Sequence, residues 1–375
     1  MTFCYSPWTN VDITPAGDIN PCAKFLSNSY DKQYNIKTDT LTDYADSDIV
    51  ANIKKDFLNG TWPKGCDRCK IEEENNIKSK RILDNERWSK QYQVYKFGDG
   101  FITAGIAFGN TCNLQCITCN PYSSSRWRNE HKLINGIDVT QFKFYKENFV
   151  NDFLSTAPNI KHLDIPGGEP FLSGVNEQHQ LLKYYIDHNK ASGITLHYTT
   201  NGTIYPDAQW WELWNHFKEV DIQISIDGVG DHYEYIRWPG QWPTLVDTVT
   251  QYIAQEKVIR NLRLSVSHTV SAYNIFYLDE FFSWCYTIGL PRPWLGRVHN
   301  PPYMRPSVWQ LDARKHIVDR LRGSNNEDVN VWAELVSSSD DSEYFDQFKN
   351  KLMLHDQYRN LDFAETFPEM ASYIK

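Results

Sequence analysis

The sequence predicts an α/β protein whose central part, residues 101–299, forms a curved or open parallel sheet. Segments with strand character alternate with segments of helical periodicity, and parallel strands need such helical crossovers. Several strands also alternate apolar and polar residues, whereas a strand packed on both faces is almost wholly apolar. The expected strands are 101–108, 160–165, 194–199, 219–226, 262–269 and 294–299, and the expected helices are 123–135, 174–191, 207–217, 243–257 and 275–288.

The alternation is clearest in the fourth and fifth expected strands. A polar face of this kind indicates an inner surface that lines a wet or ligand-filled lumen, and an edge strand with one solvated face is the alternative. A doubly wound sheet is a further alternative, although no Gly-x-Gly-x-x-Gly follows the first strand. In the fourth strand the apolar face is Val220, Ile222, Ile224 and Ile226, and the polar face is Asp221, Gln223, Ser225 and Asp227.

Length, composition and charge limit the possible classes. The 375 residues, 41% hydrophobic and 23% charged, suffice for one large domain with an appendage or for two ordinary domains. The net charge of −9 and the absence of a Lys/Arg run weigh against nucleic-acid binding. No apolar stretch approaches the length of about 18 residues that a membrane-spanning helix needs, and the N-terminus lacks signal-peptide features. We therefore expect a cytoplasmic protein without membrane or nucleic-acid partners, in which cysteines serve as ligands or catalysts.

Three cysteines follow the first expected strand at spacings of four and three: Cys112, Cys116 and Cys119. Closed structural metal sites usually take four ligands, so three thiolates leave one position open. A [4Fe–4S] cluster on these three would keep one iron free for an outside ligand. The alternative is a zinc site completed by a distant residue, but zinc knuckles usually start from a C-x2-C pair.

Four more cysteines form a second candidate metal site near the N-terminus. They are Cys4, Cys22, Cys66 and Cys69. A β-hairpin predicted at residues 11–19 brings the first two together, and the last two form a C-x2-C pair. Four thiolates complete a coordination sphere, so we expect a structural or electron-transferring site, for which spacing leaves zinc and iron open.

Helices are also expected outside the central sheet. Residues 48–59 have helical spacing, and a long, mostly solvated helix is expected from Cys69 to about Trp88. After the last strand we expect a helical extension with no chemistry of its own, with segments 307–322, 331–336 and 343–357. The predicted parts are a cysteine-bearing module at 1–95, the sheet at 96–300 and the extension at 301–375.

Short motifs follow successive expected strands. Each taken singly is only a turn signal, but loops after parallel strands collect at the carboxyl edge, where ligands bind. Together the motifs therefore predict one site. They are the three-cysteine stretch, Pro166-Gly167-Gly168-Glu169-Pro170, Thr199-Thr200-Asn201-Gly202 and Ser225-Ile226-Asp227-Gly228, with Tyr235-Ile236-Arg237-Trp238 downstream.

In this order the motifs resemble those of the radical SAM superfamily. The resemblance implies a partial (β/α)6 TIM-like barrel and a [4Fe–4S] cluster on the three cysteines, whose open iron binds S-adenosylmethionine. Thr118 departs from the pattern, because many members place an aromatic residue there, near the adenine. The implied contacts with S-adenosylmethionine are Gly167, Gly168 and Glu169 to the amino group, Ser225 near the ribose and Arg237 to the carboxylate, with Asn201 and Asp227 also at the site.

The N-terminal cysteines resemble a second family pattern. Cys4-x12-Gly17-x4-Cys22, followed by a C-x2-C pair, is similar to the Twitch module, a shortened relative of SPASM. This resemblance implies an auxiliary [4Fe–4S] cluster. The module precedes the barrel here, as in a subgroup of small Twitch-type radical SAM proteins, and the two resemblances together cover about residues 1–300.

The resemblance also implies a reaction. Reductive cleavage of S-adenosylmethionine, with an electron from a donor such as flavodoxin or ferredoxin, yields a 5′-deoxyadenosyl radical that removes a substrate hydrogen. A fully ligated auxiliary cluster favours net oxidation, such as a crosslink, of a ribosomally made peptide or protein. The alternatives are a radical SAM dehydrogenase or modifier of a small molecule (alcohol, sugar or nucleoside) and a non-catalytic zinc or iron–sulfur scaffold.

One cysteine is left over. Cys285 lies on an apolar helix face and is expected to be buried and structural. Epimerisation, which often needs a thiol hydrogen donor, is therefore disfavoured. Four residues near the last strand are weaker candidates for substrate contact: Trp294, Arg297, His299 and Tyr303.

Overall fold

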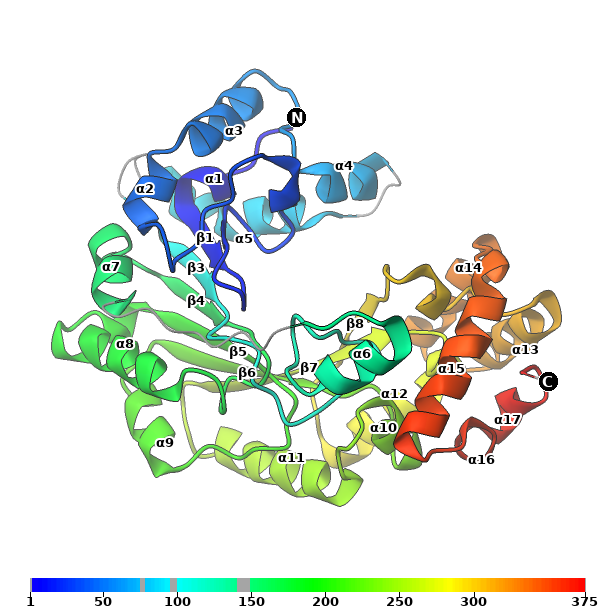
Figure 1. Ribbon diagram of the computed structural model, residues 1–375. Helices are drawn as coiled ribbons and strands as arrows, with labels where there is room; N and C mark the ends of the chain where they lie inside the picture. Colours follow the sequence, from blue (N-terminus) through cyan, green and yellow to red (C-terminus); the bar gives the residue numbers. More distant parts are fainter. Residues whose placement is uncertain (1, 75–77, 95–99, 140–148, 375) are drawn as a thin grey trace. The chain divides into compact units, whose positions relative to one another are not determined.

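The computed structural model describes residues 2–74, 78–94, 100–139 and 149–374 and contains an eight-stranded sheet (Figure 1). Its strand order is β2-β1-β3-β4-β5-β6-β7-β8, so β2 and β8 are its edges. The pair β1–β2 is antiparallel, whereas β1–β3, β3–β4, β4–β5 and β7–β8 are parallel. The strands are β1 (Asn10–Ile13), β2 (Ile19–Asn20), β3 (Thr103–Ile106), β4 (His162–Ile165), β5 (Thr195–Thr200), β6 (Glu219–Ser225), β7 (Leu262–Val270) and β8 (Trp294–Arg297).

All six strands expected in the central part are present, and they lie in the sheet in the order in which they occur in the chain. A doubly wound sheet reverses its strand order at a switch point. The doubly wound alternative is therefore wrong. The prediction of an open, mostly parallel α/β sheet, as in a partial TIM-like barrel, is confirmed.

The five expected crossover helices are present as α6 (Trp127–Asn135), α8 (Val175–Asp187), α9 (Ala208–Trp214), α11 (Trp242–Glu256) and α12 (Leu278–Ile288). Two short helices, α7 (Phe149–Thr156) and α10 (Asp231–Ile236), were not predicted. The N-terminal helices are α1 (Ser6–Thr9), α2 (Leu41–Ala45), α3 (Asp48–Leu58), α4 (Asp67–Glu74) and α5 (Lys80–Val94). The C-terminal helices are α13 (Leu311–Arg322), α14 (Glu327–Ser338), α15 (Phe345–Arg359), α16 (Phe363–Thr366) and α17 (Pro368–Ala371). Single 3-10 turns lie at Ser27–Ser29, Ala191–Gly193, Ile275–Tyr277, Pro302–Met304 and Ser342–Tyr344.

The chain folds into two compact units, each assembled from separate segments. The first unit contains Met1–Thr111, Gln141–Thr199 and Asp207–Val220, and the second contains Cys112–Thr140, Thr200–Pro206 and Asp221–Lys375. This division differs from the three predicted parts, which stay a prediction. The predicted boundary between residues 95 and 96 lies outside the described residues.

In the first unit, the predicted N-terminal hairpin is confirmed by the antiparallel pairing of β1 with β2. Val11 and Ile13 are buried on one face of β1. The strand also pairs in parallel with β3, so that the N-terminal segment extends the sheet. Helices α7, α8 and α9 lie along the outside of the strands of this unit (Figure 1).

The prediction of a single long helix from Cys69 to Trp88 is wrong. The structure has two helices, α4 and α5, and residues 78–79 between them are not helical. Ser79 is fully buried, and its hydroxyl accepts a hydrogen bond from the amide of Ile82 at 3.2 Å. A serine in this position caps the start of a new helix, which local charge patterning does not reveal.

In the second unit, the predicted alternation is confirmed on β6 and β7. Ile222, Ile224 and Val266 are buried, while polar side chains pair on the opposite face. Ser225 Oγ and Ser267 Oγ lie 3.2 Å apart, and Ser265 donates to Asp221 at 2.8 Å. The three expected C-terminal helices are present as α13, α14 and α15, and α13 packs against α14 (Figure 1).

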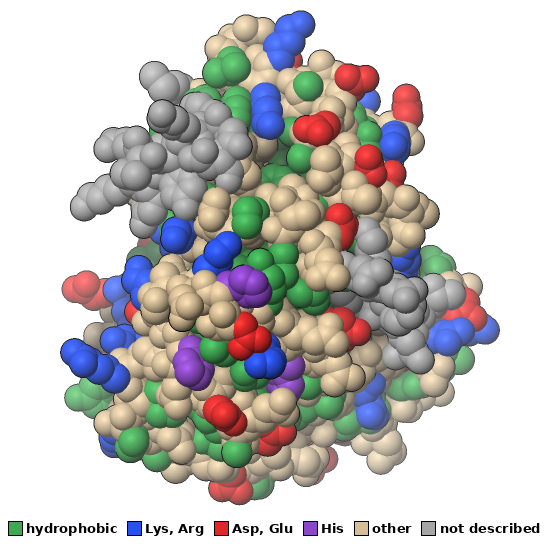
Figure 2. All heavy atoms as spheres, turned by 90° about the vertical axis from the view of Figure 1, so that its left-hand side faces the viewer, with side chains coloured by type: hydrophobic (Ala, Val, Ile, Leu, Met, Phe, Trp, Pro, Cys, Tyr) green, Lys and Arg blue, Asp and Glu red, His purple; other side chains and the backbone are tan. Residues whose placement is uncertain are grey.

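The surface carries both signs of charge. Figure 2 shows one face, on which acidic and basic side chains are intermingled. Among the helices that the structure describes, none is both long enough and apolar enough to cross a membrane.

A row of residues in register crosses the sheet of the first unit. Asp12 on β1 faces Gly105 on β3, then Asp164 on β4 and His197 on β5. A Cβ at Gly105 would lie 2.4 Å from Asp12 Oδ2, so the missing side chain leaves room for this carboxyl group. Burial raises the pKa of Asp12 to about 7, against the attraction of Lys80.

The substitution Asp12→Asn should therefore stabilise the protein more at alkaline than at acidic pH. The pKa of Asp12 is about 7 in the folded protein and about 3.9 in an unfolded chain. The folded state thus binds the proton more tightly, and its stability falls as the pH rises from about 4 to about 7. Asn does not titrate, so the variant does not lose this stability as the pH rises. The gain in Tm over the wild type should therefore be larger at about pH 8.5 than at about pH 5.5. The exposed Asp31→Asn is the control, and an equal Tm change at both pH values would contradict the prediction.

Candidate active site

The loop between β3 and α6 carries Cys112, Cys116 and Cys119, and its backbone is held by neighbours within the second unit. The amide of Gln115 donates to the carbonyl of Trp238 at 2.7 Å, and the amide of Ile117 donates to the carbonyl of Ile236 at 2.8 Å. Buried backbone groups need such partners when no regular element supplies them. The loop therefore has a defined conformation although it is neither helix nor strand.

Two of the predicted site residues point N–H groups toward the sulfurs. Asn201 Nδ2 lies 3.8 Å from Cys112 Sγ, and Arg237 Nη1 lies 3.9 Å from Cys116 Sγ. The amide of Leu114 also approaches Cys112 Sγ, at 3.4 Å. Hydrogen bonds to cysteine sulfurs are one means by which proteins tune iron–sulfur clusters. The structure thus brings Asn201 and Arg237 to the three cysteines.

Asp227 positions Arg237. Its fully buried carboxylate accepts a hydrogen bond from the amide of Thr269 at 2.7 Å, and its other oxygen lies 2.8 Å from Arg237 Nη2 in an ion pair. Arg237 is buried, and its Nε has no hydrogen-bond partner within the described part of the chain. A guanidinium with a spare donor can bind a carboxylate of a ligand.

The protonation chemistry of the thiols fits a positively charged group. Burial raises the pKa of Cys116, against the influence of Arg237, and raises that of Cys119 to about 12. Thiolates therefore form here only beside compensating positive charge, which the irons of a cluster supply. The donor set, three thiols on one loop with N–H groups directed at two of them, fits a [4Fe–4S] cluster.

The Gly-Gly-Glu motif belongs to the first unit, where it packs on the end of β3. Glu169 donates its backbone N–H to the carbonyl of Thr111 at 2.8 Å, and Gly168 donates its own to Gly109 at 3.3 Å. A Cβ on Gly168 would lie 2.3 Å from the carbonyl oxygen of Thr111, so only glycine fits. The Glu169 side chain is fully buried. The motif thereby fixes the segment that directly precedes Cys112 in the chain.

Neither a family profile nor a curated protein sequence matches this chain. Solved structures do. They include anSMEcpe with bound AdoMet, at 18% identity and a TM-score of 0.41 over 54% of this chain and 53% of that one. TYW1 with a lysine-pyruvate adduct bound matches at 15% identity and a TM-score of 0.35, over 59% and 73% of the two chains. SuiB of Streptococcus suis, bound to S-adenosylmethionine, matches at 10% identity and a TM-score of 0.38, over 96% and 72%.

The chain spans about half the length of anSMEcpe. All three proteins are radical SAM enzymes, the superfamily that the motifs resemble.

The four thiols predicted to hold an auxiliary [4Fe–4S] cluster all lie in the first unit. Electrostatic interactions connect them to one another, and burial raises the pKa of Cys4 to about 11 and that of Cys22 to about 12. Cys4 and Cys66 belong to an apolar cluster with Ile53 and Phe57 of α3. An apolar shell of this kind fits an electron-transfer cluster. Within the described residues, no three Cys, His, Asp or Glu side chains are arranged to hold a single metal ion.

Sequence reasoning missed a neighbour of the cysteines. Asn113 accepts a hydrogen bond from Asn201 and donates one to Thr203, both at 2.8 Å, and so links the cysteine loop to the loop after β5. The sequence feature that could have pointed to Asn113 is its position directly after Cys112.

The predicted burial of Cys285 is confirmed, with burial raising its pKa to about 12. Trp294 is exposed, and no finding tests the four weaker candidates for substrate contact.

The substitution Gly168→Ala should weaken binding of S-adenosylmethionine. The added methyl group meets backbone atoms of Asn110 and Thr111 and must displace the motif. We expect the Kd for S-adenosylmethionine to rise by about tenfold or more, equivalent to about 1.4 kcal/mol, in equilibrium binding to the reconstituted protein. Gly193→Ala is the matched control, because its Cβ meets only Lys161 Nζ, at 3.5 Å. An unchanged Kd in Gly168→Ala would remove the motif from the binding site.

Proposed function

We propose that this protein is a radical SAM enzyme in which Cys112, Cys116 and Cys119 hold a [4Fe–4S] cluster. The observation that carries the proposal is the three-thiol loop, toward which Asn201 and Arg237, from two later motifs, direct their N–H groups. A zinc or iron–sulfur scaffold without turnover has no need of these motifs.

The protein's own residues bind and orient S-adenosylmethionine. Arg237, held by Asp227, binds its carboxylate through the spare donor of the guanidinium. The Gly167–Glu169 motif binds its amino group, and Ser225 lies near its ribose. When bound, the cluster and S-adenosylmethionine supply a 5′-deoxyadenosyl radical that removes a hydrogen atom from the substrate.

We further propose an auxiliary [4Fe–4S] cluster on the four N-terminal thiols, with zinc as the alternative. The apolar shell around Cys4 and Cys66 supports it. A flavodoxin or ferredoxin serves as the electron donor. Reduced thiols are the rule in the cytoplasm, which is the location we propose.

The proposed reaction is a net oxidation of a ribosomally made peptide or protein, such as a crosslink. This follows from the Twitch-like cysteine pattern and from a closed four-thiol site that can take up an electron. A small polar molecule is the second candidate substrate, because the row of Asp12, Asp164 and His197 presents carboxyl and imidazole groups on one face of the sheet.

Replacing any one of Cys112, Cys116 and Cys119 by Ala should abolish formation of 5′-deoxyadenosine. Wild-type protein reconstituted anaerobically should bind about eight irons, and each of these variants about four, because one cluster of four irons is lost. Cys66→Ala should also lose about four irons yet keep the barrel folded and retain cleavage of S-adenosylmethionine uncoupled from substrate oxidation. Cys285→Ala is the control outside both sites. Zinc in place of iron, with no deoxyadenosine, would establish the scaffold alternative instead.

The peptide proposal is tested by incubation with S-adenosylmethionine, dithionite and a small peptide encoded beside this protein's gene. We expect the peptide to lose the mass of two hydrogen atoms while 5′-deoxyadenosine accumulates. The same assay with a set of alcohols, sugars and nucleosides is the comparison. Turnover of one of these metabolites without a change in peptide mass would favour the small-molecule enzyme.

A further inference from the structure

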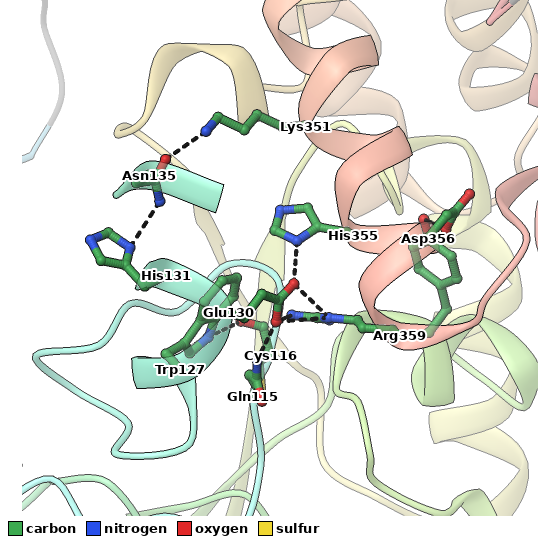
Figure 3. A network of polar contacts seen from close by, with 11 residues as sticks. Gln115, Cys116, Trp127, Glu130, His131, Asn135, Lys351, His355, Asp356 and Arg359 are labelled. Carbon is green, nitrogen blue, oxygen red and sulfur yellow. Dashed lines mark hydrogen bonds and ion pairs between the residues drawn. The ribbon is translucent and has the colours of Figure 1, made fainter. Parts of the chain in front are cut away.

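A buried ionic network in the second unit connects the C-terminal helix α15 to the cysteine loop (Figure 3). Glu130 of α6 is fully buried, and it accepts hydrogen bonds from His355 and Arg359 of α15. The Arg359 guanidinium contacts both carboxylate oxygens, at 3.0 to 3.2 Å. The same carboxylate also accepts a hydrogen bond from the side chain of Gln115, which lies between Cys112 and Cys116 in the sequence.

The charges of the network balance. Burial opposes the charge of Glu130, but the hydrogen bond from His355 and the nearby Arg359 lower its pKa. Burial also lowers the pKa of His355, which favours its neutral form. The network therefore contains one carboxylate and one guanidinium, and each requires the other to remain charged while buried.

A second set of contacts runs from Arg359 to the backbone of the loop. The guanidinium lies over two indole rings, 5.1 Å from Trp127 and 5.4 Å from Trp238. The indole N–H of Trp127 donates to the carbonyl of Cys116 at 2.9 Å. The carbonyl of Trp238, the neighbour of Arg237, accepts from the amide of Gln115 at 2.7 Å. Arg359 of α15 thus contacts the rings of both tryptophans that hold the loop backbone, Trp127 through its indole N–H and Trp238 through its backbone carbonyl.

Stability alone does not explain this arrangement. A buried ion pair recovers little net energy after desolvation, and apolar residues of similar volume often stabilise a fold as well or better. Its geometric requirements, however, are strict, because two charged groups with fixed hydrogen-bond directions fit in only one way. Such a network is suited to fixing the position of what it touches, which here is the cysteine loop.

We propose that Glu130, His355 and Arg359 are positioning residues that set the arrangement of Cys116 and its neighbours for the cluster, so that α15 belongs functionally to the cluster site. The proposal rests on the proposed function of the three cysteines. It assigns a role to the C-terminal extension, which sequence analysis expected to have no chemistry of its own.

The test compares three variants by the reactivity of individual thiols in the iron-free, reduced protein. Glu130→Gln removes the carboxylate and leaves Arg359 buried without its partner. The double variant Glu130→Gln/Arg359→Met restores charge balance but not the directed contacts. Lys351→Ala is the matched control, because Lys351 joins the same two helices through Asn135 without reaching the loop (Figure 3). Alkylation by iodoacetamide is followed at each cysteine by mass spectrometry, with Cys4 and Cys22 as internal references.

We expect Glu130→Gln to raise the alkylation rates of Cys116 and Cys119 by about tenfold, similar in size to the smallest loss of metal affinity when a supporting contact of a ligand is removed. The rates at Cys4 and Cys22 should stay as in the wild type. The double variant should recover the Tm lost in Glu130→Gln but keep the raised rates at Cys116 and Cys119. After reconstitution, Glu130→Gln and the double variant should each lose iron from the three-cysteine loop to a chelator about tenfold faster than Lys351→Ala does.

Three results would overturn the proposal. One is an equal rise at all cysteines, which indicates general loosening of the fold. Another is a double variant whose Cys116 rate returns to the wild-type value, which indicates that only charge balance matters. The third is unchanged rates in Glu130→Gln. Because these rates are measured without iron, they decide the proposal even if the wild-type protein fails to form 5′-deoxyadenosine, which would refute the proposed function separately.

Discussion

The constraint on which the candidate site depends is that an irregular loop must hold three thiols in one arrangement. Neither a helix nor a strand satisfies the backbone groups of this loop, so other segments must do so. The carbonyls of Ile236 and Trp238 accept the amides of Ile117 and Gln115, and Ser124 donates to the carbonyl of Leu114 at 2.6 Å. The residues after β6 thus serve two purposes, because they also include Arg237, which lies next to Cys116 Sγ.

Much of the fold was predictable because its signals are local. An apolar run located β3, alternation with a period of two marked β6 and β7, and the turn at residues 15–18 located the N-terminal hairpin. The pairing of β1 with β3 was not predictable, because it joins segments about ninety residues apart that carry no mark of one another. The break between α4 and α5 was missed because it depends on a single capping serine in a charged stretch. The short helix α10 has too few residues to show a period.

The candidate site was predictable to the extent that its residues form motifs at strand ends. Asn201, Asp227 and Arg237 were named from such motifs, and the structure places them in contact with the cysteines or with one another. Glu130, His355 and Arg359 were not predicted as site residues, although they are among the most buried charged or titratable side chains of the second unit. Glu130 lies 225 and 229 residues from His355 and Arg359 in the sequence. A lone glutamate on an amphipathic helix is ordinarily a solvent-exposed residue, and only the tertiary structure shows that this one is buried.

The two groups of cysteines differ in how much the protein must do to arrange them. Four thiolates that surround one metal group are held in place by the group itself, and an apolar shell such as that of Ile53 and Phe57 around Cys4 is sufficient support. Three thiolates leave one corner of a cluster to a ligand that comes and goes, so the group alone fixes them less completely. The protein must supply the remaining positional information through directed contacts. If the two sites hold clusters as proposed, this difference accounts for the location of the buried ion pair of Glu130 and Arg359 beside the three-cysteine loop, where orientation matters more than the free energy of burial.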